Sequence, residues 1–200
     1  MSQAAGPGGA GVLETEAALV ARARDGDVDA FEQLAGAHAD RLFALLVRLL
    51  GDRGEAEDVA QEVMLRAWRG IGRFHGQSLF FTWLYRIAVN EANRSLDKSA
   101  RRPAYTSIEA AAVQLPAAAR EEPARRLEQT ELREALSRAL VRLPPDYRIA
   151  VVLHDVEGLS APQAAEVAGC GEAAFKSRLH QARLRIRAAI GDDALINAGS

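Results

Sequence analysis

The most constraining feature of this 200-residue sequence is a repeat of apolar residues at helical spacing. Between Leu132 and Leu143, apolar residues recur three or four positions apart, which places them on one face of an α-helix. The segments Ala56–Ala67 and Phe31–Leu49 show the same spacing, and the longer one allows a bend near Gly36. No long stretch alternates polar and apolar residues, as a half-buried strand would. The sequence therefore predicts an all-α fold.

One long interval, residues 103–125, lacks this repeat and contains Pro103, Pro116 and Pro123. Proline fixes the backbone φ angle and has no amide proton, so we expect a flexible linker between two small helical domains. The predicted divisions are a tail (1–11), an N-terminal helical bundle (12–102), the linker (103–125), a C-terminal four-helix domain (126–191) and a second tail (192–200).

The charge of the chain is unevenly distributed. A net charge of −2 argues against a uniformly basic surface for nucleic acid. Five basic residues and no acidic one nevertheless fall between Lys176 and Arg187, whereas the segment from Asp25 to Glu62 is rich in acidic residues. A local basic stretch suits contact with phosphates, but a solvated helix face has the same composition. Charge alone leaves both interpretations open.

The sequence holds no pattern typical of an enzyme, a metal site or a membrane span. Cys170 is the single cysteine, so no intramolecular disulfide can form, and no His/Cys cluster supplies metal ligands. Neither a phosphate-binding loop nor a nucleophile with a nearby base is readable, so we expect no catalytic residue, metal or cofactor. The apolar run Leu42–Leu50 is short and contains Arg48, and the first eleven residues lack the basic start of a signal peptide. We expect a cytoplasmic protein without membrane insertion.

The C-terminal domain has the pattern of a helix-turn-helix. Pro144–Pro145 end its first helix, and a second helix is predicted over Asp146–Val156. Ser160 can cap a short third helix, which ends at a turn containing Gly169 and Gly171. A fourth, basic helix is predicted over 172–190. A short helix, a glycine turn and a long basic helix are typical of DNA-binding domains, although other helical pairs share this pattern.

The fourth helix is expected to present different residues to the core and to DNA. Phe175, Leu179 and Ile186 would face the core of the domain. Residues early in a recognition helix reach the base edges in the major groove, and flanking cations bind phosphates. The residues expected at bases are Lys176, Ser177, His180 and Gln181, and those expected mostly at phosphates are Arg178, Arg183 and Arg185.

Aromatic residues gather in the N-terminal domain, where six of the chain's eleven lie between Trp68 and Tyr85. With arginines among them, they suit the stacking of unpaired bases, but large aromatic rings also dominate ordinary cores. For Phe80 and Trp83, which share a helix face with aliphatic residues, a core role is favoured. The polar, glycine-containing loop Arg73–Ser78 is the better candidate for a ligand.

Three segments resemble one family, the extracytoplasmic-function (ECF) sigma factors of bacterial RNA polymerase. AEDVAQEVMLRAWRGIGRF (56–74) resembles its polymerase-binding helix, and FFTWLYRIAVNEANRSLDKSARR (80–102) resembles the helix that reads and melts the minus-ten element. The segment 139–190 is similar to its minus-thirty-five helix-turn-helix. Two independent sets of motifs in the family's order are more specific than either alone.

The resemblance implies a non-enzymatic factor that binds core RNA polymerase, through the β′ clamp and the β flap, and promoter DNA. An anti-sigma factor is a further partner that the family implies. The implied clamp-binding residues are Asp58, Gln61 and Glu62, with Arg66 and Arg69 nearby. The implied minus-ten residues include a loop of Arg73, Phe74, His75, Gly76, Gln77 and Ser78, which with Asn90 would form the pocket for a flipped base. Contacts to the upstream duplex or its backbone are implied for Asn93, Arg94, Arg101 and Arg102. The implied minus-thirty-five residues, all on the fourth helix, are Lys176, Ser177, Arg178, His180 and Gln181.

Several positions depart from the family pattern, among them Pro162, Ala164 and Ala165 in the third helix, where larger residues are common. Ala174 and Phe175 stand where the family has a small hydroxyl-bearing residue and a valine, and Gln181 stands where a basic residue is frequent. These departures affect which promoter is read more than the role itself. The alternative function is a stand-alone helix-turn-helix regulator, which would leave the N-terminal motifs without a task.

Overall fold

The computed structural model describes residues 15–76, 78–100 and 123–197, with side chains of the last segment described from 133 to 191. Every regular element in these ranges is helical, and the described part contains no strand. The prediction of an all-α fold is therefore confirmed. One helical group precedes residues 101–122 and a second follows them. Residues 101–122, which include most of the predicted linker, fall outside the described ranges.

The N-terminal group consists of α1 (Glu16–Arg24), α2 (Val28–Leu50), α3 (Arg53–Gly70), the 3₁₀ turn η1 (Ile71–Arg73) and α4 (Phe80–Ala100). The side chains of Thr15, Asp27 and Asp52 accept hydrogen bonds from the first-turn amides of α1, α2 and α3. These bonds satisfy donors that have no partner inside a helix. Gly51, with φ +78°, ends α2 in the left-handed region that glycine adopts without strain. The α2 helix runs through Gly36 without a break.

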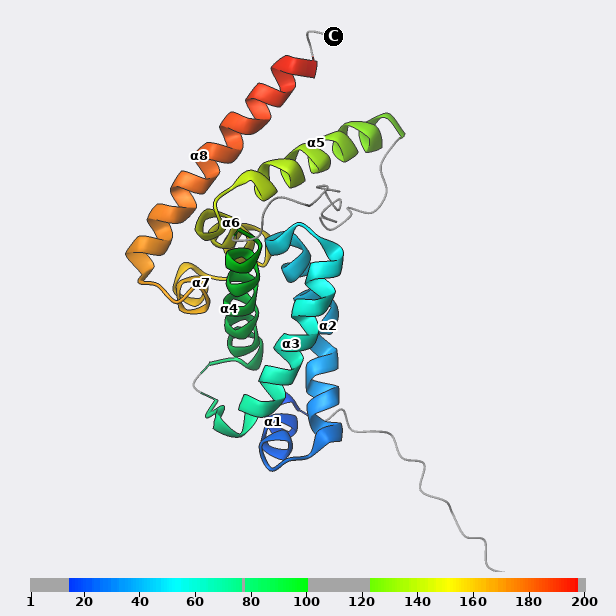
Figure 1. Ribbon diagram of the computed structural model, residues 1–200, viewed down its shortest axis with the longest axis vertical. Coiled ribbons are helices and arrows are strands. Elements are labelled where there is room, and N and C mark those ends of the chain that lie inside the picture. The colour runs from blue at the N-terminus through cyan, green and yellow to red at the C-terminus, as the bar shows by residue number, and fades with distance from the viewer. Residues whose placement is uncertain (1–14, 77, 101–122, 198–200) are drawn as a thin grey trace, which may run out of the picture.

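The core of this group is aliphatic and aromatic. α2 contributes Leu42, Leu45 and Leu46, none of which is exposed. α4 packs against α2 with Phe80 and Leu84 buried, α3 packs along both helices, and α1 lies across the lower end of the group (Figure 1). The periodic apolar residues of the sequence are therefore the ones that the fold buries.

The C-terminal group consists of α5 (Pro123–Arg142), α6 (Pro145–Val151), the π-helical turn η2 (Val152–Val156), α7 (Ala161–Val167) and α8 (Glu172–Asn197). The helix predicted over Asp146–Val156 is thus an α-helix that widens into a π turn. Ser160 precedes α7, and its amide donates to the side chain of Gln163 at 3.1 Å. α8 continues past the expected end at residue 190.

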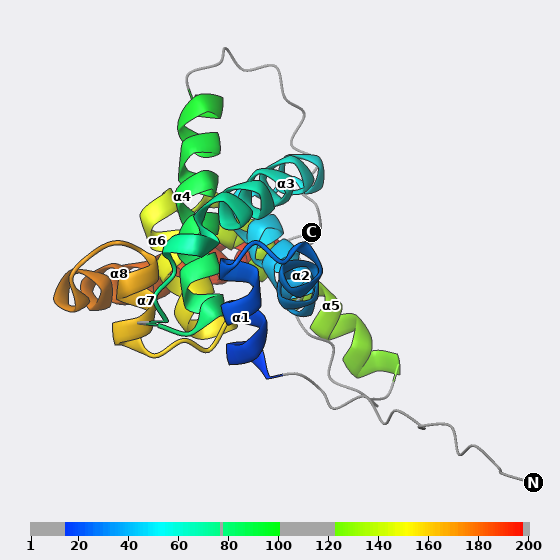
Figure 2. The same cartoon turned by 90° about the horizontal axis from the view of Figure 1, so that it is seen from below.

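The two groups pack against each other. α7 lies beside α4, and α5 and α6 contact the C-terminal end of α2 (Figures 1 and 2). The buried apolar residues of both groups form one continuous cluster. A side chain at Gly51 would come within 3.1 Å of Val141, so this approach needs glycine. The predicted domain boundaries remain predictions.

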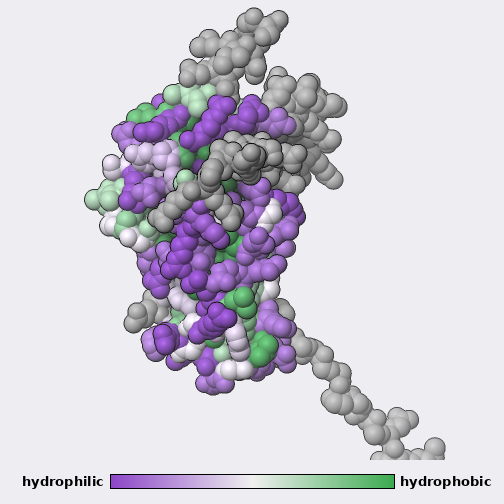
Figure 3. Space-filling model, viewed as in Figure 1, coloured by the Kyte–Doolittle hydropathy of each residue, from purple (hydrophilic) through white to green (hydrophobic). Residues whose placement is uncertain are grey.

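The surface seen in Figure 3 is mostly hydrophilic, with apolar residues in small separate areas. Leu65 and Leu79 are among the larger exposed apolar side chains. Within the described ranges, no helix combines the length and apolar character needed to cross a bilayer.

Candidate polymerase and nucleic-acid interfaces

The outer face of α8 carries most of the residues predicted to contact bases. Phe175 and Leu179 are buried against α6 and α7, as predicted, while Ile186 is half-buried. The residues predicted to read bases lie on the side of α8 that faces away from Phe175 and Leu179. All four are exposed: Lys176, Ser177, His180 and Gln181. This face of α8 is therefore polar and open to solvent.

Several cations on α8 already have partners within the domain. Lys176 Nζ lies 2.5 Å from Glu172, and Arg178 lies 3.2 Å from Asp146. The guanidinium of Arg185 lies over the ring of Tyr147, 4.8 Å from its centroid. These pairs are largely solvent-exposed, so phosphate oxygens can replace the carboxylates at little cost.

Arg183 differs from the other predicted phosphate contacts. It binds both carboxylate oxygens of Asp155, at 3.0 and 2.5 Å, and this hydrogen bonding raises the pKa of Arg183. It lies at the edge of an apolar groove of about 420 Å³ between α5, α6 and α8. The Arg183 side chain is nevertheless 52% exposed, so its predicted contact with phosphate remains a prediction. The groove is lined mainly by Leu136, Leu140, Val151, Val156, Ile186 and Ile190.

The loop between η1 and α4 has an exposed tip and a buried base. His75 and Gly76 are exposed, whereas Phe74 is buried against Phe80 and Trp83, with ring centroids 6.0 and 5.2 Å away. The ring of Phe74 therefore anchors the loop, and we remove it from the expected base-contacting surface. Arg73 is exposed and Ser78 half-buried, and Gln77 lies outside the described residues.

The residues predicted on α4 lie farther along that helix, from its middle onward. Asn90 is exposed and Asn93 half-buried. Asn90 is ten residues after Phe80, the first residue of α4, which corresponds to about 15 Å along the helix axis. Asn90 is therefore too far from the loop for both to hydrogen-bond to the same group of one base. Arg94 is exposed and lies 2.5 Å from the buried carboxylate of Glu91. Arg101 and Arg102 lie outside the described residues.

One face of α3 holds the residues predicted to bind polymerase. Asp58, Gln61 and Arg69 are exposed, and Glu62 is half-buried. Arg66 Nε bridges Glu62 at 2.7 Å and Glu91 at 3.1 Å, which ties this face to α4. Leu65 is 50% exposed and shares the face, because it lies seven residues after Asp58. Sequence reasoning missed Leu65, although its helical spacing from Asp58 is a signal that finds it.

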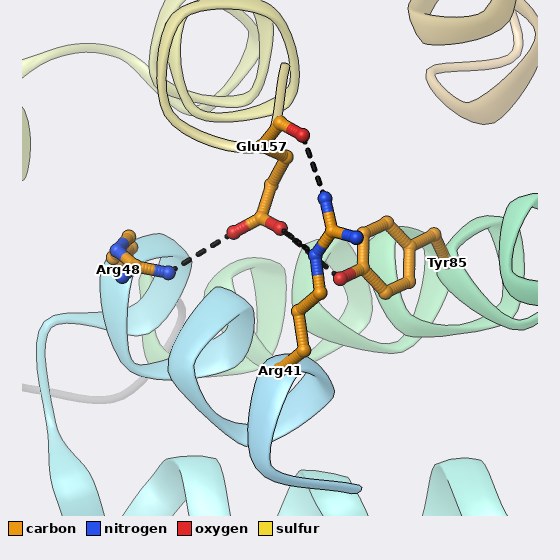
Figure 4. Close-up of polar contacts among 4 residues, drawn as sticks. All are labelled: Arg41, Arg48, Tyr85 and Glu157. Atoms are coloured by element: carbon orange, nitrogen blue, oxygen red, sulfur yellow. Dashed lines mark hydrogen bonds and ion pairs between the residues drawn. The ribbon is translucent and has the colours of Figure 1, made fainter. Parts of the chain in front are cut away.

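Sequence reasoning also missed a polar site between the two helical groups, buried except for Arg41 and here called the Glu157 cluster: Arg41, Arg48, Tyr85 and Glu157. Figure 4 shows the Glu157 carboxylate at its centre, accepting from Arg41 Nε (2.9 Å), Arg48 Nη1 (3.0 Å) and the Tyr85 hydroxyl (3.1 Å). Arg41 Nη2 also donates to the Glu157 carbonyl oxygen at 2.7 Å. The Glu157 side chain is 4% exposed, so its charge depends on these donors.

Burial and charge shift the pKa values within this cluster. Burial raises the pKa of Tyr85, and the adjacent Glu157 charge raises it further, so the phenol stays protonated and donates. Burial alone would lower the pKa of Arg41, but the hydrogen bond with Glu157 and the electrostatic influence of Tyr85 and Glu157 together outweigh burial and raise it.

A second buried arginine joins the two groups nearby. Arg148 donates to the carbonyl oxygens of Leu140, Val141 and Leu143 at the end of α5, and to that of Leu49 near the end of α2. Helix C-termini leave such carbonyls without partners, and a cation suits their dipoles. Burial lowers the pKa of Arg148.

Comparison with known proteins agrees with this geometry. The sequence profile of sigma-70 region 2 matches residues 34–102, and that of sigma-70 region 4 matches residues 133–186. The RNA polymerase sigma-H factor of Pseudomonas aeruginosa is 35% identical over 182 residues, covering 88% of this chain and 94% of that protein. The ECF RNA polymerase sigma-E factor of Escherichia coli is 35% identical over 174 residues, covering 84% and 91%.

Solved structures give the same result. A complex of CnrH with the cytosolic domain of CnrY has a TM-score of 0.59 at 27% identity, covering 91% of this chain and 97% of that chain. The sigma factor RpoE of Bartonella quintana, in complex with the anti-sigma factor NepR, has a TM-score of 0.63 at 25% identity, covering 82% and 98%. Two helical domains with a helix-turn-helix define the class of sigma-70 transcription initiation factors, and the chain belongs to its ECF family.

Proposed function

We propose that the chain directs core RNA polymerase to specific promoters, with the α3 face on polymerase and with α4 and α8 on DNA. The observation that carries this proposal is that one chain presents all three surfaces, exposed and separate, on two helical groups. A stand-alone helix-turn-helix regulator would use α8 but would leave the α3 face without a task. We further propose that the chain has no enzymatic activity of its own and acts in the cytoplasm, where bacterial polymerase works.

The α3 face is proposed to bind the β′ clamp. Leu65 supplies an apolar centre, and Asp58, Gln61 and Arg69 supply polar groups around it. Such an arrangement is typical of protein interfaces, where a few central residues dominate the binding energy. We expect Asp58→Arg to weaken binding to core polymerase at least tenfold and to leave the helical content unchanged. Unchanged affinity, measured by fluorescence titration, would remove this face from the proposal.

The apolar groove between α5, α6 and α8 is proposed to receive the β flap. Its lining is almost entirely aliphatic, and Arg183 and Asp155 at its edge supply polar groups. An apolar cleft of this kind fits the nonpolar face of a helix. We expect Leu136→Asp to weaken polymerase binding and to leave Asp58-dependent clamp contact intact.

Promoter reading is divided between two surfaces. On α8, we propose that Lys176, Ser177, His180 and Gln181 read the minus-thirty-five element, with Arg178, Arg183 and Arg185 on phosphates. In the N-terminal group, we propose that the tip of the Arg73–Ser78 loop receives a flipped base. Asn90, Asn93 and Arg94 would contact other nucleotides, because the helix separates them from the loop. Arg101 and Arg102 remain proposed contacts to upstream DNA.

The minus-ten surface is tested by Asn90→Ala. An exposed asparagine supplies both a donor and an acceptor to a base edge, and its loss leaves the fold intact. We expect slower opening of the cognate promoter with unchanged affinity for core polymerase, measured by permanganate footprinting and by titration. Equal opening by the variant and the original protein would discard this assignment.

An anti-sigma factor is proposed as a regulatory partner. The support is that the relative RpoE is solved in complex with the anti-sigma factor NepR.

A further inference from the structure

Buried charge is concentrated at the boundary between the two helical groups. Four charged residues are buried in the described part of the chain: Arg48, Glu91, Arg148 and Glu157. Three of them, all except Glu91, bond across the boundary. A buried charge is costly without partners of correct geometry, so such a boundary fits together in one arrangement only.

The backbone around Glu157 is shaped to deliver its side chain to this boundary. The η2 turn inserts one residue into the helix, and the Glu157 amide bonds to the carbonyl of Val152 at 2.9 Å. One residue changes direction around a helix by about 100°, so an uninterrupted α-helix would point position 157 elsewhere. Gly158, with φ +73°, then turns the chain toward α7. π-helical turns are frequent at functional sites, and this one presents a carboxylate to α2 and α4.

The closed arrangement is incompatible with reading a whole promoter. Elements named for positions minus ten and minus thirty-five are about 25 base pairs apart, or roughly 85 Å along the duplex. In the closed protein, α7 lies directly against α4, and Arg41 and Glu157 are hydrogen-bonded. The 22 residues between Ala100 and Pro123 can span at most roughly 75 Å. Together with the length of the two helical groups, this reach is enough for the groups to separate and contact both promoter elements.

We propose that the Glu157 cluster is an intramolecular lock that holds the free protein closed and opens when the two groups engage their separate promoter elements. Closure leaves the base-reading face of α8 and Asn90 exposed, so the lock does not cover the DNA-binding surfaces. It prevents their simultaneous use. The opening step rests on the proposed function, whereas the existence of the lock does not.

The chemistry of the cluster makes the lock reversible. When the groups separate, Arg41, Arg48 and Glu157 each regain water, which offsets much of the lost ion pairing. Replacing Glu157 by glutamine removes the charge but keeps the shape of the side chain. The two arginines then face a neutral group inside the closed boundary, which favours the open state.

The test measures the distance between the two groups in the free, full-length protein. Spin labels are placed at the exposed positions Gln33 (on α2) and Ala173 (on α8), each changed to cysteine in a Cys170→Ser background. We expect one short distance in the original sequence and a population at longer distance, at least tenfold larger, in Glu157→Gln. Arg41→Gln tests the lock from the other side, because Arg41 is 53% exposed and its replacement leaves the N-terminal core untouched.

The matched control is Glu134→Gln, which makes the same change of charge on the exposed surface of α5. It should keep the short distance. A broad or long distance distribution in the original protein would overturn the proposal. So would a Glu157→Gln distribution equal to that of Glu134→Gln.

Adding core polymerase and promoter DNA separates the lock from the proposed function. With both, the original protein should shift to the longer distance, and Glu157→Gln should associate faster than the original. A short distance retained in a polymerase complex that opens the promoter would contradict the opening step. An open Glu157→Gln variant that never binds polymerase would support the lock and count against the proposed function.

Discussion

The interior of the N-terminal group and the boundary between the two groups are both buried, but different side chains fill them. The interior is packed with aliphatic and aromatic residues such as Leu42, Leu46 and Phe80. The boundary adds Arg48, Arg148 and Glu157 to the apolar contacts. Apolar contacts tolerate small shifts and are lost only by exposing surface to water, whereas buried charges require one geometry and are rehydrated on separation. We infer that the interior is permanent and that the boundary can open.

The largest effect is expected in the interior. Leu46 is completely buried, so Leu46→Ala should lower the free energy of unfolding of the N-terminal group by about 3 kcal/mol. Denaturant unfolding monitored by tryptophan fluorescence measures this, because Trp68 and Trp83 are the two tryptophans and both lie in this group. The spin-label distance should remain short below the melting temperature. A Leu46→Ala variant that keeps its stability but shows a longer distance between the spin labels would contradict the distinction between interior and boundary.

A smaller effect is expected at Arg148. In Arg148→Met, buried carbonyl oxygens at the ends of α5 and α2 lose their donor, which should destabilise the C-terminal group by about 2 kcal/mol. Thermal unfolding followed by circular dichroism measures the loss. Arg142→Met, at an exposed position on α5, is the matched control and should change little. Equal stability of the two variants would show that the carbonyls find other donors.

The sequence predicts the permanent part of this comparison better than the separable part. The interior follows from periodicity, because Leu42, Leu45 and Leu49 repeat at helical spacing. Glu157 gives no such signal: it is one acidic residue before a glycine, and its partners lie more than 70 positions away. Arg48 offered a hint, since a charge inside the apolar run Leu42–Leu50 requires a buried partner or an interruption of the core.

The site residues divide in the same way. The exposed face of α8 follows from helical spacing, whereas the α3 face was predicted from the resemblance to the family. The pairing of Arg183 with Asp155 and the burial of Phe74 were not, because both depend on how helices pack in three dimensions. The π turn at Val152–Val156 was equally unreadable, since its residues fit an ordinary helix.

Alkaline pH provides a third way to sharpen the comparison. Burial raises the pKa of Tyr85 in the closed protein, while an exposed phenol ionises near pH 10. Tyr85 therefore contributes its full stabilisation below about pH 10 and loses it as pH rises further, because the open or unfolded state releases a proton there first. Arg41 and Arg48 on α2 and Glu157 at the end of η2 face the phenol. We expect closure to weaken above pH 10 in the original protein.

Tyr85→Phe isolates this contribution, because other groups titrate equally in both proteins. The variant should lose about 1 kcal/mol of closure at neutral pH, corresponding to one hydrogen bond. The difference from the original protein should shrink above pH 10. A constant difference between pH 8 and pH 11, measured by the spin-label distance, would contradict the role of the phenol.

The smallest effect is expected at Glu91, which among the described residues is a buried charge of the N-terminal group that bonds only within that group. Its partners Arg66 and Arg94 are 42% and 63% exposed, so solvent screens both pairs. Glu91→Gln should cost roughly 0.5 kcal/mol of stability and leave the interdomain distance unchanged. Chemical denaturation checks the first expectation and the spin labels check the second. A longer distance in this variant would show that closure depends on the N-terminal group as a whole.

Transcription in vitro with purified core polymerase, followed by mapping of start sites on genomic DNA fragments, tests most directly whether two separable helical groups serve one promoter. The expected result is a set of starts that require the factor, share two spaced upstream elements, and disappear with Asp58→Arg. The contradicting result is no association with core polymerase at low salt, together with tight, sequence-specific DNA binding by the factor alone.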